Sequence, residues 1–236
     1  MSKIKKLNDI FKKTNDKHYD VLVATQPNSL YAESFRKIPI NLKYVDVDNE
    51  PKVIQISSAL PGEYKTTTSI NLAAAYHELG EKVIIIDCDL RRPKIHRATK
   101  VLNDVGLTNY LADQITEKEL IKQSEYGFDV ITSGESVPYP HVILASDKFK
   151  KLVMKLREEY DYIIIDSPPV LLVTDSLVIS GSVDATLFVL NQKVARKNEV
   201  KEALRLLEEA NAKVAGIVLS NVDKRYFNYS RYGEYY

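Results

Sequence analysis

Short runs of apolar residues alternate with longer amphipathic stretches over most of this chain. The first run, residues 53–57, precedes an alanine-rich stretch over residues 66–80 that ends at a glycine. This alternation indicates strands of a parallel sheet that are connected by helices and covered on both faces. Further apolar runs predict strands at residues 83–87, 128–134, 162–166, 185–190 and 214–220, and amphipathic stretches predict helices at 147–160 and 197–212.

The part of the chain before this regular pattern predicts one more helix. Residues 28–45 have helical spacing, and Asn28 or Ser29 can cap the N-terminus. Pro39 is expected to weaken or end this helix, because proline lacks an N–H group and clashes with the preceding turn.

The first eighteen residues form a basic segment with apolar residues at roughly helical spacing, namely Ile4, Leu7, Ile10 and Phe11. A basic amphipathic helix can lie on an anionic membrane surface or dock on a partner. The alternative is a solvated, partly frayed extension. We therefore divide the chain into a basic N-terminal extension (1–27), one α/β domain (28–223) and a tail (224–236).

Composition narrows the possible functions. At 236 residues and 44% hydrophobic, the chain can bury one substantial core. A net charge of +1 argues against a nucleic-acid binder, which normally has a strongly basic face. The single cysteine, Cys88, excludes an internal disulfide, and we expect its thiol to be structural and to face into the packing. No apolar block has the length of a signal peptide or membrane span, so we expect a cytoplasmic protein.

A candidate phosphate-binding loop joins the first strand to its helix. The sequence ALPGEYKTTT approximates the pattern G-x-x-x-x-G-K-[ST], in which backbone N–H groups and the helix N-terminus hold phosphate. Lys65 could reach the terminal phosphates, and the Thr66 hydroxyl could bind Mg²⁺. The residues expected to contact the nucleotide are Pro61, Gly62, Glu63, Tyr64, Lys65, Thr66 and Thr67.

This loop departs from the pattern at two positions. Ala59 stands in place of the first glycine and Tyr64 in place of the second. Glycine beside the lysine permits tight curvature and close approach of phosphate. If Tyr64 adopts a positive φ angle, the conformational cost is on the order of 1–3 kcal/mol.

Acidic residues end two of the predicted strands. Asp87 and Asp89 close one strand and Asp166 closes another. Ligands of open α/β sheets bind beyond the carboxyl ends of the strands, so these carboxylates should meet the loop there. We expect Asp87, Asp166 and Thr66 to hold Mg²⁺, and Asp87 also to accept the proton of an incoming hydroxyl. A single strand-end aspartate commonly caps the next helix, but three in this arrangement favour a catalytic site.

The two arginines that follow Asp89 leave several roles open. Arg91 and Arg92 could reach phosphate, contact another subunit or form ordinary surface pairs. The sequence does not favour one of these roles over the others.

The tail contains five tyrosines in its last eleven residues, namely Tyr226, Tyr229, Tyr232, Tyr235 and Tyr236. A chain terminus has no core that needs such a row of phenols. Beside a nucleotide-binding domain, the row indicates phosphoryl transfer to tyrosine. Transfer between subunits is the simpler geometry, because a short tail cannot easily present all five phenols to its own site.

Together these stretches resemble the bacterial tyrosine kinases of capsule and exopolysaccharide operons, in the Gram-positive type that is separate from its membrane adaptor. The resemblance covers residues 28–236. It is carried by SALPGEYKTTTSINLA, VIIIDCDLRRP, VGLTNYLAD, YIIIDSPPVLLVTD, GIVLSNVD and the tyrosine tail. The D-x-D-x-R strand end and the terminal tyrosines distinguish this family from the related MinD/ParA partition ATPases.

The resemblance implies a three-layer P-loop NTPase-like α/β fold with a mostly parallel sheet, and an autokinase that uses ATP and Mg²⁺. Lys65 and Thr66 match the family's Walker A motif, Asp87 and Asp89 its Walker A′ pair, and Asp166 its Walker B aspartate. These four charged residues (Lys65, Asp87, Asp89 and Asp166) are the catalytic candidates.

The resemblance also implies partners. A transmembrane adaptor of the polysaccharide co-polymerase type would activate the kinase and recruit it to the inner face of the cell membrane. Subunits of the family phosphorylate one another's tails in a ring, and a cognate tyrosine phosphatase would reverse the reaction. The family's oligomerisation helix reads E-x-x-R-x-x-R; Glu33 and Arg36 match, whereas Pro39 replaces the last arginine.

Two other functions stay open from the sequence alone. One is a MinD/ParA-like ATPase, whose products are ADP and a conformational change. The other is a catalytically weakened, scaffold-like homologue in which Tyr64 impairs the loop.

Overall fold

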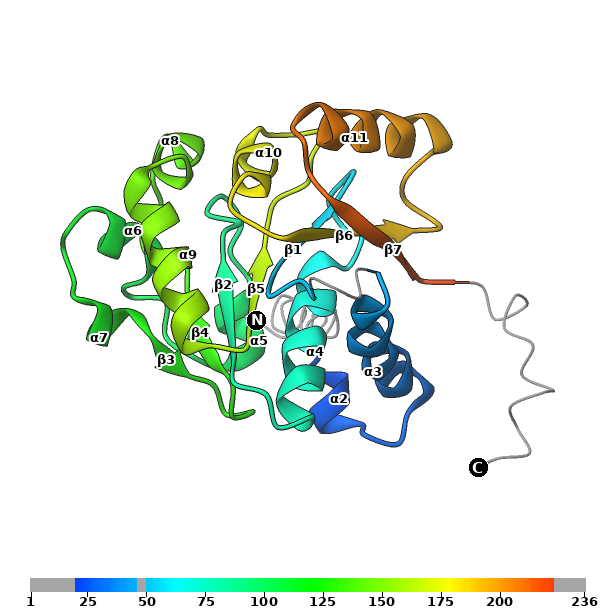
Figure 1. The fold of residues 1–236 in the computed structure, drawn as a ribbon, viewed down its shortest axis with the longest axis horizontal. Helices are drawn as coiled ribbons and strands as arrows, with labels where there is room; N and C mark the ends of the chain where they lie inside the picture. Colours follow the sequence, from blue (N-terminus) through cyan, green and yellow to red (C-terminus); the bar gives the residue numbers. More distant parts are fainter. Residues whose placement is uncertain (1–19, 46–49, 223–236) are drawn as a thin grey trace, which may run out of the picture.

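A seven-stranded sheet forms the centre of the molecule (Figure 1). The computed structural model describes residues 20–45 and 50–222. The strands run in the order β3-β4-β2-β5-β1-β6-β7, and all neighbours are parallel except β3 and β4. Their bounds are β1 (Val53–Ser58), β2 (Val83–Asp87), β3 (Lys122–Gln123), β4 (Asp129–Ile131), β5 (Tyr162–Asp166), β6 (Ala185–Asn191) and β7 (Val214–Ser220).

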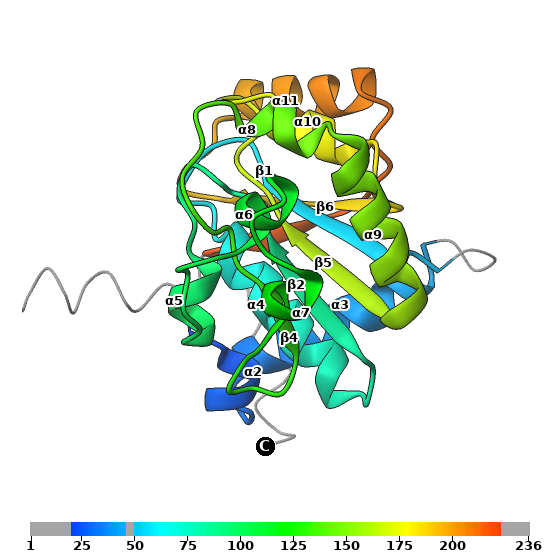
Figure 2. The same ribbon diagram turned by 90° about the vertical axis from the view of Figure 1, so that its left-hand side faces the viewer.

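Helices cover both faces of this sheet, as the two views show (Figures 1 and 2). The helices α2–α5 pack on one face, and α6–α11 pack on the other. The predicted three-layer α/β fold is therefore confirmed. The helix bounds are α2 (Leu22–Thr25), α3 (Leu30–Lys43), α4 (Lys65–Glu78), α5 (Ile95–Thr99), α6 (Leu107–Leu111), α7 (Glu117–Leu120), α8 (Pro140–Leu144), α9 (Asp147–Glu159), α10 (Asp175–Ser180) and α11 (Lys197–Glu209).

The central strands are apolar on both sides because both sides are buried. In β5, Ile164 packs with α2–α5, whereas Ile163 and Ile165 pack with α6–α10. Successive side chains of a strand point to opposite faces, so a strand between two helical layers needs an unbroken apolar run. The last residues of β2 and β5, Asp87 and Asp166, are polar but are buried as well.

Of the two outcomes predicted for Pro39, that it weakens its helix or ends it, the second is wrong. The helix α3 continues through Pro39 to Lys43. It is capped by Ser29, whose hydroxyl accepts the N–H of Ala32 at 3.1 Å. Pro39 and the nearby Leu42 are buried against the body, and this packing offsets the missing backbone hydrogen bond.

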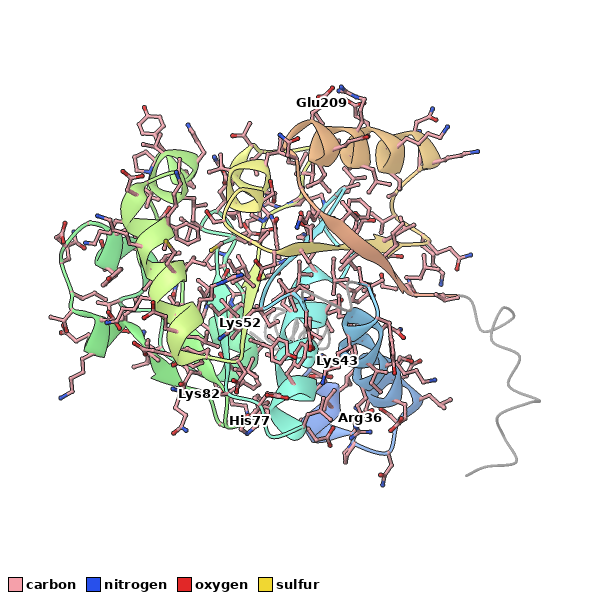
Figure 3. The ribbon with its side chains drawn as sticks, in the orientation of Figure 1. Arg36, Lys43, Lys52, His77, Lys82 and Glu209 are labelled. Atoms are coloured by element: carbon pink, nitrogen blue, oxygen red, sulfur yellow. The ribbon has the colours of Figure 1, made fainter. Side chains whose placement is uncertain are left out.

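An ion-pair cluster fixes α3 against α4. Arg36 donates to both carboxylate oxygens of Glu78 at 2.6 and 2.9 Å, and also to Glu33 at 2.6 Å. Figure 3 shows Arg36 on α3 near the end of α4 that carries His77. In this structure Glu33 and Arg36, the two residues that match the family's oligomerisation motif, therefore pair within one chain.

The described part of the predicted N-terminal extension packs onto the body. Val21 and Val23 are buried with the core on the α4 side of the sheet. The N–H of Val23 donates to Oδ1 of Asn71 on α4 at 3.0 Å. Within the described ranges, no helix combines the length and the apolarity that crossing a membrane requires.

Candidate active site

The loop between β1 and α4 forms a tight turn at the carboxyl edge of the sheet. Gly62 has a φ angle of +82°, and Tyr64, the residue before α4, has φ 69° and ψ 27°. The left-handed conformation that the sequence raised for Tyr64 is thus present. A tyrosine there lacks the freedom of glycine, so the loop contains backbone strain on the order of 1–3 kcal/mol.

Glu63 anchors this loop from the inside. Its buried carboxylate accepts the N–H of Leu60 at 2.7 Å and the N–H of Asn191 at 3.1 Å. The side-chain amide of Asn191 donates to the Gly62 carbonyl at 3.2 Å, and the Ser220 hydroxyl donates to the Glu63 carbonyl at 3.2 Å. The Glu63 side chain therefore ties the loop to β6, and its backbone carbonyl ties the loop to β7, roles that the sequence analysis missed.

The first turn of α4 contacts the end of β5. The Thr66 hydroxyl donates to Oδ2 of Asp166 at 2.7 Å, and the Ser69 hydroxyl donates to Oδ1 at 2.9 Å. Residues three apart on a helix share one face, which is why both hydroxyls reach one carboxylate. Sequence reasoning missed Ser69, although this spacing from Thr66 was available as a signal.

Asp87 lies beside Asp166 because β2 and β5 pair in register with these two residues opposite each other. Asp87 also accepts the N–H groups of Lys94 and Ile95 at 3.0 and 3.1 Å, so it caps the start of α5 as well. Burial, and then the charges of Asp166 and Asp89, raise the pKa of Asp87 well above its ordinary value.

Lys65 is the cation of this acidic cluster. It is buried, and burial lowers its pKa, whereas the charges of Asp166 and Asp89 oppose that shift. Burial raises the pKa of Asp166 to about 6, although Lys65 and the Thr66 hydroxyl favour its ionised form. Burial also raises the pKa of Asp89. The site thus gathers three carboxylates beside the buried ammonium group of Lys65, with Lys94 as a second cation nearby.

The chemistry of these donors fits Mg²⁺ bound together with a nucleotide. Hard oxygen donors suit Mg²⁺, which needs one or two protein ligands and takes its others from water and phosphate. Among the described residues, no group of three His, Cys, Asp or Glu side chains could hold a metal ion alone. The arrangement matches an ion shared with phosphate oxygens rather than a metal site made of protein alone.

Cys88, between the two aspartates of the β2 end, is buried as the sequence predicts. Its N–H donates to the Asp166 carbonyl at 2.9 Å. Burial raises the pKa of the Cys88 thiol well above its ordinary value, which agrees with a structural rather than a reactive thiol.

Arg91 extends the site toward α10 by an ion pair that the sequence did not reveal. Its Nε donates to Oδ2 of Asp175 at 2.9 Å, and this carboxylate is fully buried. Asp175 lies 84 residues further along the chain, so no local pattern relates the two residues. The pair attaches the segment after Asp89 to the first turn of α10.

Replacing Arg91 with alanine is expected to destabilise the protein by about 1–3 kcal/mol, because the buried Asp175 carboxylate loses its cation. Urea unfolding measures this change. Arg92→Ala is the matched control, since Arg92 is exposed, and should stay within about 0.5 kcal/mol of the parent. Adding Asp175→Asn to Arg91→Ala should restore part of the loss. Equal stabilities of the two single variants would contradict this role for the pair.

Comparison with known proteins places this arrangement in a family. The AAA domain model matches residues 51–215. The chain is 35% identical over 217 residues to the tyrosine-protein kinase YwqD of Bacillus subtilis (strain 168), covering 92% of this chain and 91% of that protein. It is 32% identical to the tyrosine-protein kinase CpsD of Streptococcus agalactiae, covering 86% and 89%. The chain belongs to the bacterial tyrosine-protein kinase family.

Solved structures agree with this assignment to the tyrosine kinases of capsule and exopolysaccharide operons. The kinase domain of the Escherichia coli tyrosine kinase ETK superposes with a TM-score of 0.84 at 33% identity, covering 87% of this chain and 81% of that one. The chimerical protein CapA2B2 gives 0.81 at 36% identity, covering 84% and 88%.

More distant structures share the fold alone. The septum site-determining protein MinD of Pyrococcus horikoshii, complexed with Mg-ADP, matches with a TM-score of 0.60 at 23% identity, covering 71% of this chain and 69% of that one. The chain therefore has the fold of the P-loop NTPases to which MinD belongs.

Proposed function

We propose that this protein is an ATP-dependent protein-tyrosine autokinase that phosphorylates the tyrosine-rich tail of a neighbouring copy. The observation that carries the proposal is the meeting of Lys65, Thr66 and Asp166 at the phosphate loop, with Asp87 in register beside Asp166. This arrangement occurs in a chain whose relatives are tyrosine-protein kinases.

In this proposal the loop residues 61–67 hold the phosphates of ATP. The backbone N–H groups at the start of α4 and the helix dipole favour a polyanion there. Lys65, buried among carboxylates, would place its ammonium group on the β- and γ-phosphates. Phosphoryl transfer needs little beyond such positioning and charge compensation.

Thr66, Asp87 and Asp166 would hold Mg²⁺ with the nucleotide. When bound, Mg²⁺ neutralises phosphate charge and orients the transferred group. Asp87 would also orient the incoming phenol and accept its proton. Asp89, which faces Lys65, would complete the acidic edge of the site.

The acceptors would be Tyr226, Tyr229, Tyr232, Tyr235 and Tyr236, which lie outside the described residues. Each phosphate adds roughly −1.5 to −2 charges to the tail. Several phosphates on one tail would repel one another and the carboxylates of the receiving site. Phosphorylation would therefore release the tail and loosen an assembly of subunits.

The proposal includes a membrane adaptor of the polysaccharide co-polymerase type, which would activate the kinase and recruit it to the inner face of the cell membrane. The family membership supports this partner. The proposal also includes homo-oligomerisation and a cognate tyrosine phosphatase that removes the tail phosphates. Cycles of tail phosphorylation and dephosphorylation would regulate polysaccharide synthesis and export. No nucleic acid takes part in it.

Incubating the purified chain with Mg-ATP and the cytoplasmic fragment of its adaptor, then probing for phosphotyrosine, tests the proposal. We expect a strong signal that is lost when the five tail tyrosines become phenylalanine and also in Lys65→Met. Release of phosphate without phosphotyrosine would instead identify a MinD/ParA-like ATPase. If the folded parent chain forms neither phosphotyrosine nor free phosphate, the protein is the scaffold-like homologue in which Tyr64 impairs the loop.

A further inference from the structure

A long apolar groove lies between α3 and the sheet edge at β7. Its volume is about 1340 Å³. Residues from α2, α3, β6, β7 and the start of α4 line it. Several apolar side chains along it are largely exposed: Tyr31 by 60%, Val45 by 52%, Ile217 by 50% and Leu219 by 59%. Such a continuous apolar surface on a chain of this size indicates a binding site.

The groove begins where the described chain begins. Asp20 and Leu22, among the first residues of the described structure, are part of its lining. The nineteen preceding residues therefore join the body at the groove itself. The groove also reaches Tyr64 and Thr67 of the phosphate loop and Val222, where the described chain ends.

The segment before Asp20 has the composition that this groove would take. Ile4, Leu7, Ile10 and Phe11 recur at the spacing of one helical face, and lysines occupy much of the rest. As a helix, nineteen residues would span about 28 Å at about 1.5 Å per residue, which exceeds the length of about 21 Å for the fourteen-residue α3. The apolar positions 4–11 can thus lie along α3 and β7.

We propose that residues 3–18 of the same chain dock in this groove as an amphipathic helix, with Ile4, Leu7, Ile10 and Phe11 facing α3 and β7. The docked segment uses the helix-in-groove mode of recognition, in which apolar side chains spaced by three and four residues fill an apolar channel. Its lysines stay in water. Because the segment is tethered at Asp20, docking needs no second molecule.

The tail that follows Val222 is the other nearby segment, but its composition fits less well. Residues 223–236 carry charged groups and phenols, with Phe227 as the purely apolar large side chain. The groove offers mainly aliphatic and aromatic surface from α3 and β7 and few charges. The N-terminal segment is therefore the occupant that the chemistry favours.

A single tryptophan can report the docking, because the chain contains none. In the full chain, Phe11→Trp should give a blue-shifted emission that is protected from acrylamide. Adding Leu219→Glu in the groove should shift the emission to the value for exposed tryptophan. Leu102→Glu is the matched control, since Leu102 is exposed but does not line the groove, and it should leave the emission blue-shifted.

A second experiment does not alter the body of the protein. Hydrogen exchange of β7 and α3 should be faster in Leu7→Glu than in the parent, whereas Asn8→Glu, which adds the same charge at the neighbouring position, should match the parent. Equal exchange in all three proteins would overturn the proposal.

Other occupants give different results, each of which would overturn the proposal. Protected emission from Phe227→Trp, with exposed emission from Phe11→Trp, would assign the groove to the tail. Protection of Phe11→Trp that disappears on dilution would assign it to a second copy. Protection that requires the adaptor fragment would assign it to the adaptor complex. A blue shift that is independent of concentration and adaptor supports docking within one chain.

Discussion

Replacing Asp166 with asparagine is expected to abolish tail phosphorylation and, at the same time, to stabilise the nucleotide-free protein. Both effects follow from one feature. The Asp166 carboxylate is buried beside Asp87, and its neighbours compensate only part of the cost of burying its negative charge. The loss of activity should reach at least about 100-fold, because preorganised charge at a phosphoryl-transfer site has effects of that order. The measurement is phosphotyrosine formation in the presence of Mg-ATP.

The gain in stability has a defined pH dependence. The folded-state pKa of Asp166 is raised to about 6, above its ordinary value near 3.8. A raised pKa means that the contribution of Asp166 to the stability of the wild type is fully present below pH 4 and is lost as the pH rises through 6. Asparagine has no such ionisation, so Asp166→Asn should be more stable by about 2–3 kcal/mol at pH 7.5 and no more stable at pH 4.

Thermal unfolding with EDTA at the two pH values measures this difference. Asp184→Asn is the matched control for the same substitution. Asp184 accepts the N–H groups of Lys52 and Val53 at 2.9 and 2.8 Å and pairs with Arg157, so its charge is compensated. The free energy of unfolding of Asp184→Asn should be lower than that of the parent by about 1–3 kcal/mol. If Asp166→Asn were destabilised at pH 7.5 as Asp184→Asn is, the carboxylate cluster would not be a source of instability.

Replacing Tyr64 with glycine is expected to raise ATP affinity about tenfold, which corresponds to about 1.4 kcal/mol. Glycine adopts φ 69° without strain and removes the side chain that stands beside Lys65. Phosphate can then approach the backbone closely. Isothermal titration with Mg-ATP measures the affinity, and tail phosphorylation should increase with it.

Tyr64→Ala separates the two causes of the effect. Alanine removes the ring but keeps the Cβ atom and therefore the strained conformation. An affinity between those of the parent and the glycine variant would assign part of the effect to the ring and part to the backbone. Unchanged affinity in both variants would show that the loop tolerates tyrosine, and the scaffold alternative would lose its physical basis.

The sequence predicted the features of this protein that depend on local patterns. The apolar runs located the sheet strands apart from the two-residue β3, because strands buried on both faces have to be apolar throughout. The loop and the strand-end aspartates followed from the rule that ligands bind at carboxyl ends. The geometry agrees, since Thr66 contacts Asp166 and Asp87 lies opposite it.

The features that sequence reasoning missed depend on contacts between distant residues or on tertiary packing. Arg91 forms an ion pair with Asp175, which is distant in the sequence, and the Glu63 carboxylate accepts the N–H of Asn191. Pro39 was misjudged because its local cost is clear in the sequence, whereas the packing that offsets it exists only in the folded chain. The short helices α2, α5–α8 and α10 were also missed, since four to six residues carry too little periodicity to detect.

The hydrogen bond from Ser220 to the Glu63 carbonyl has a mechanical consequence. Ser220 ends β7, and the tail begins a few residues later. Tension on a tail that a neighbour has captured would reach Ser220 first and pass through this hydrogen bond to the turn that carries Tyr64. Substrate capture by one subunit would thus exert force on the nucleotide loop of the subunit that donates the tail.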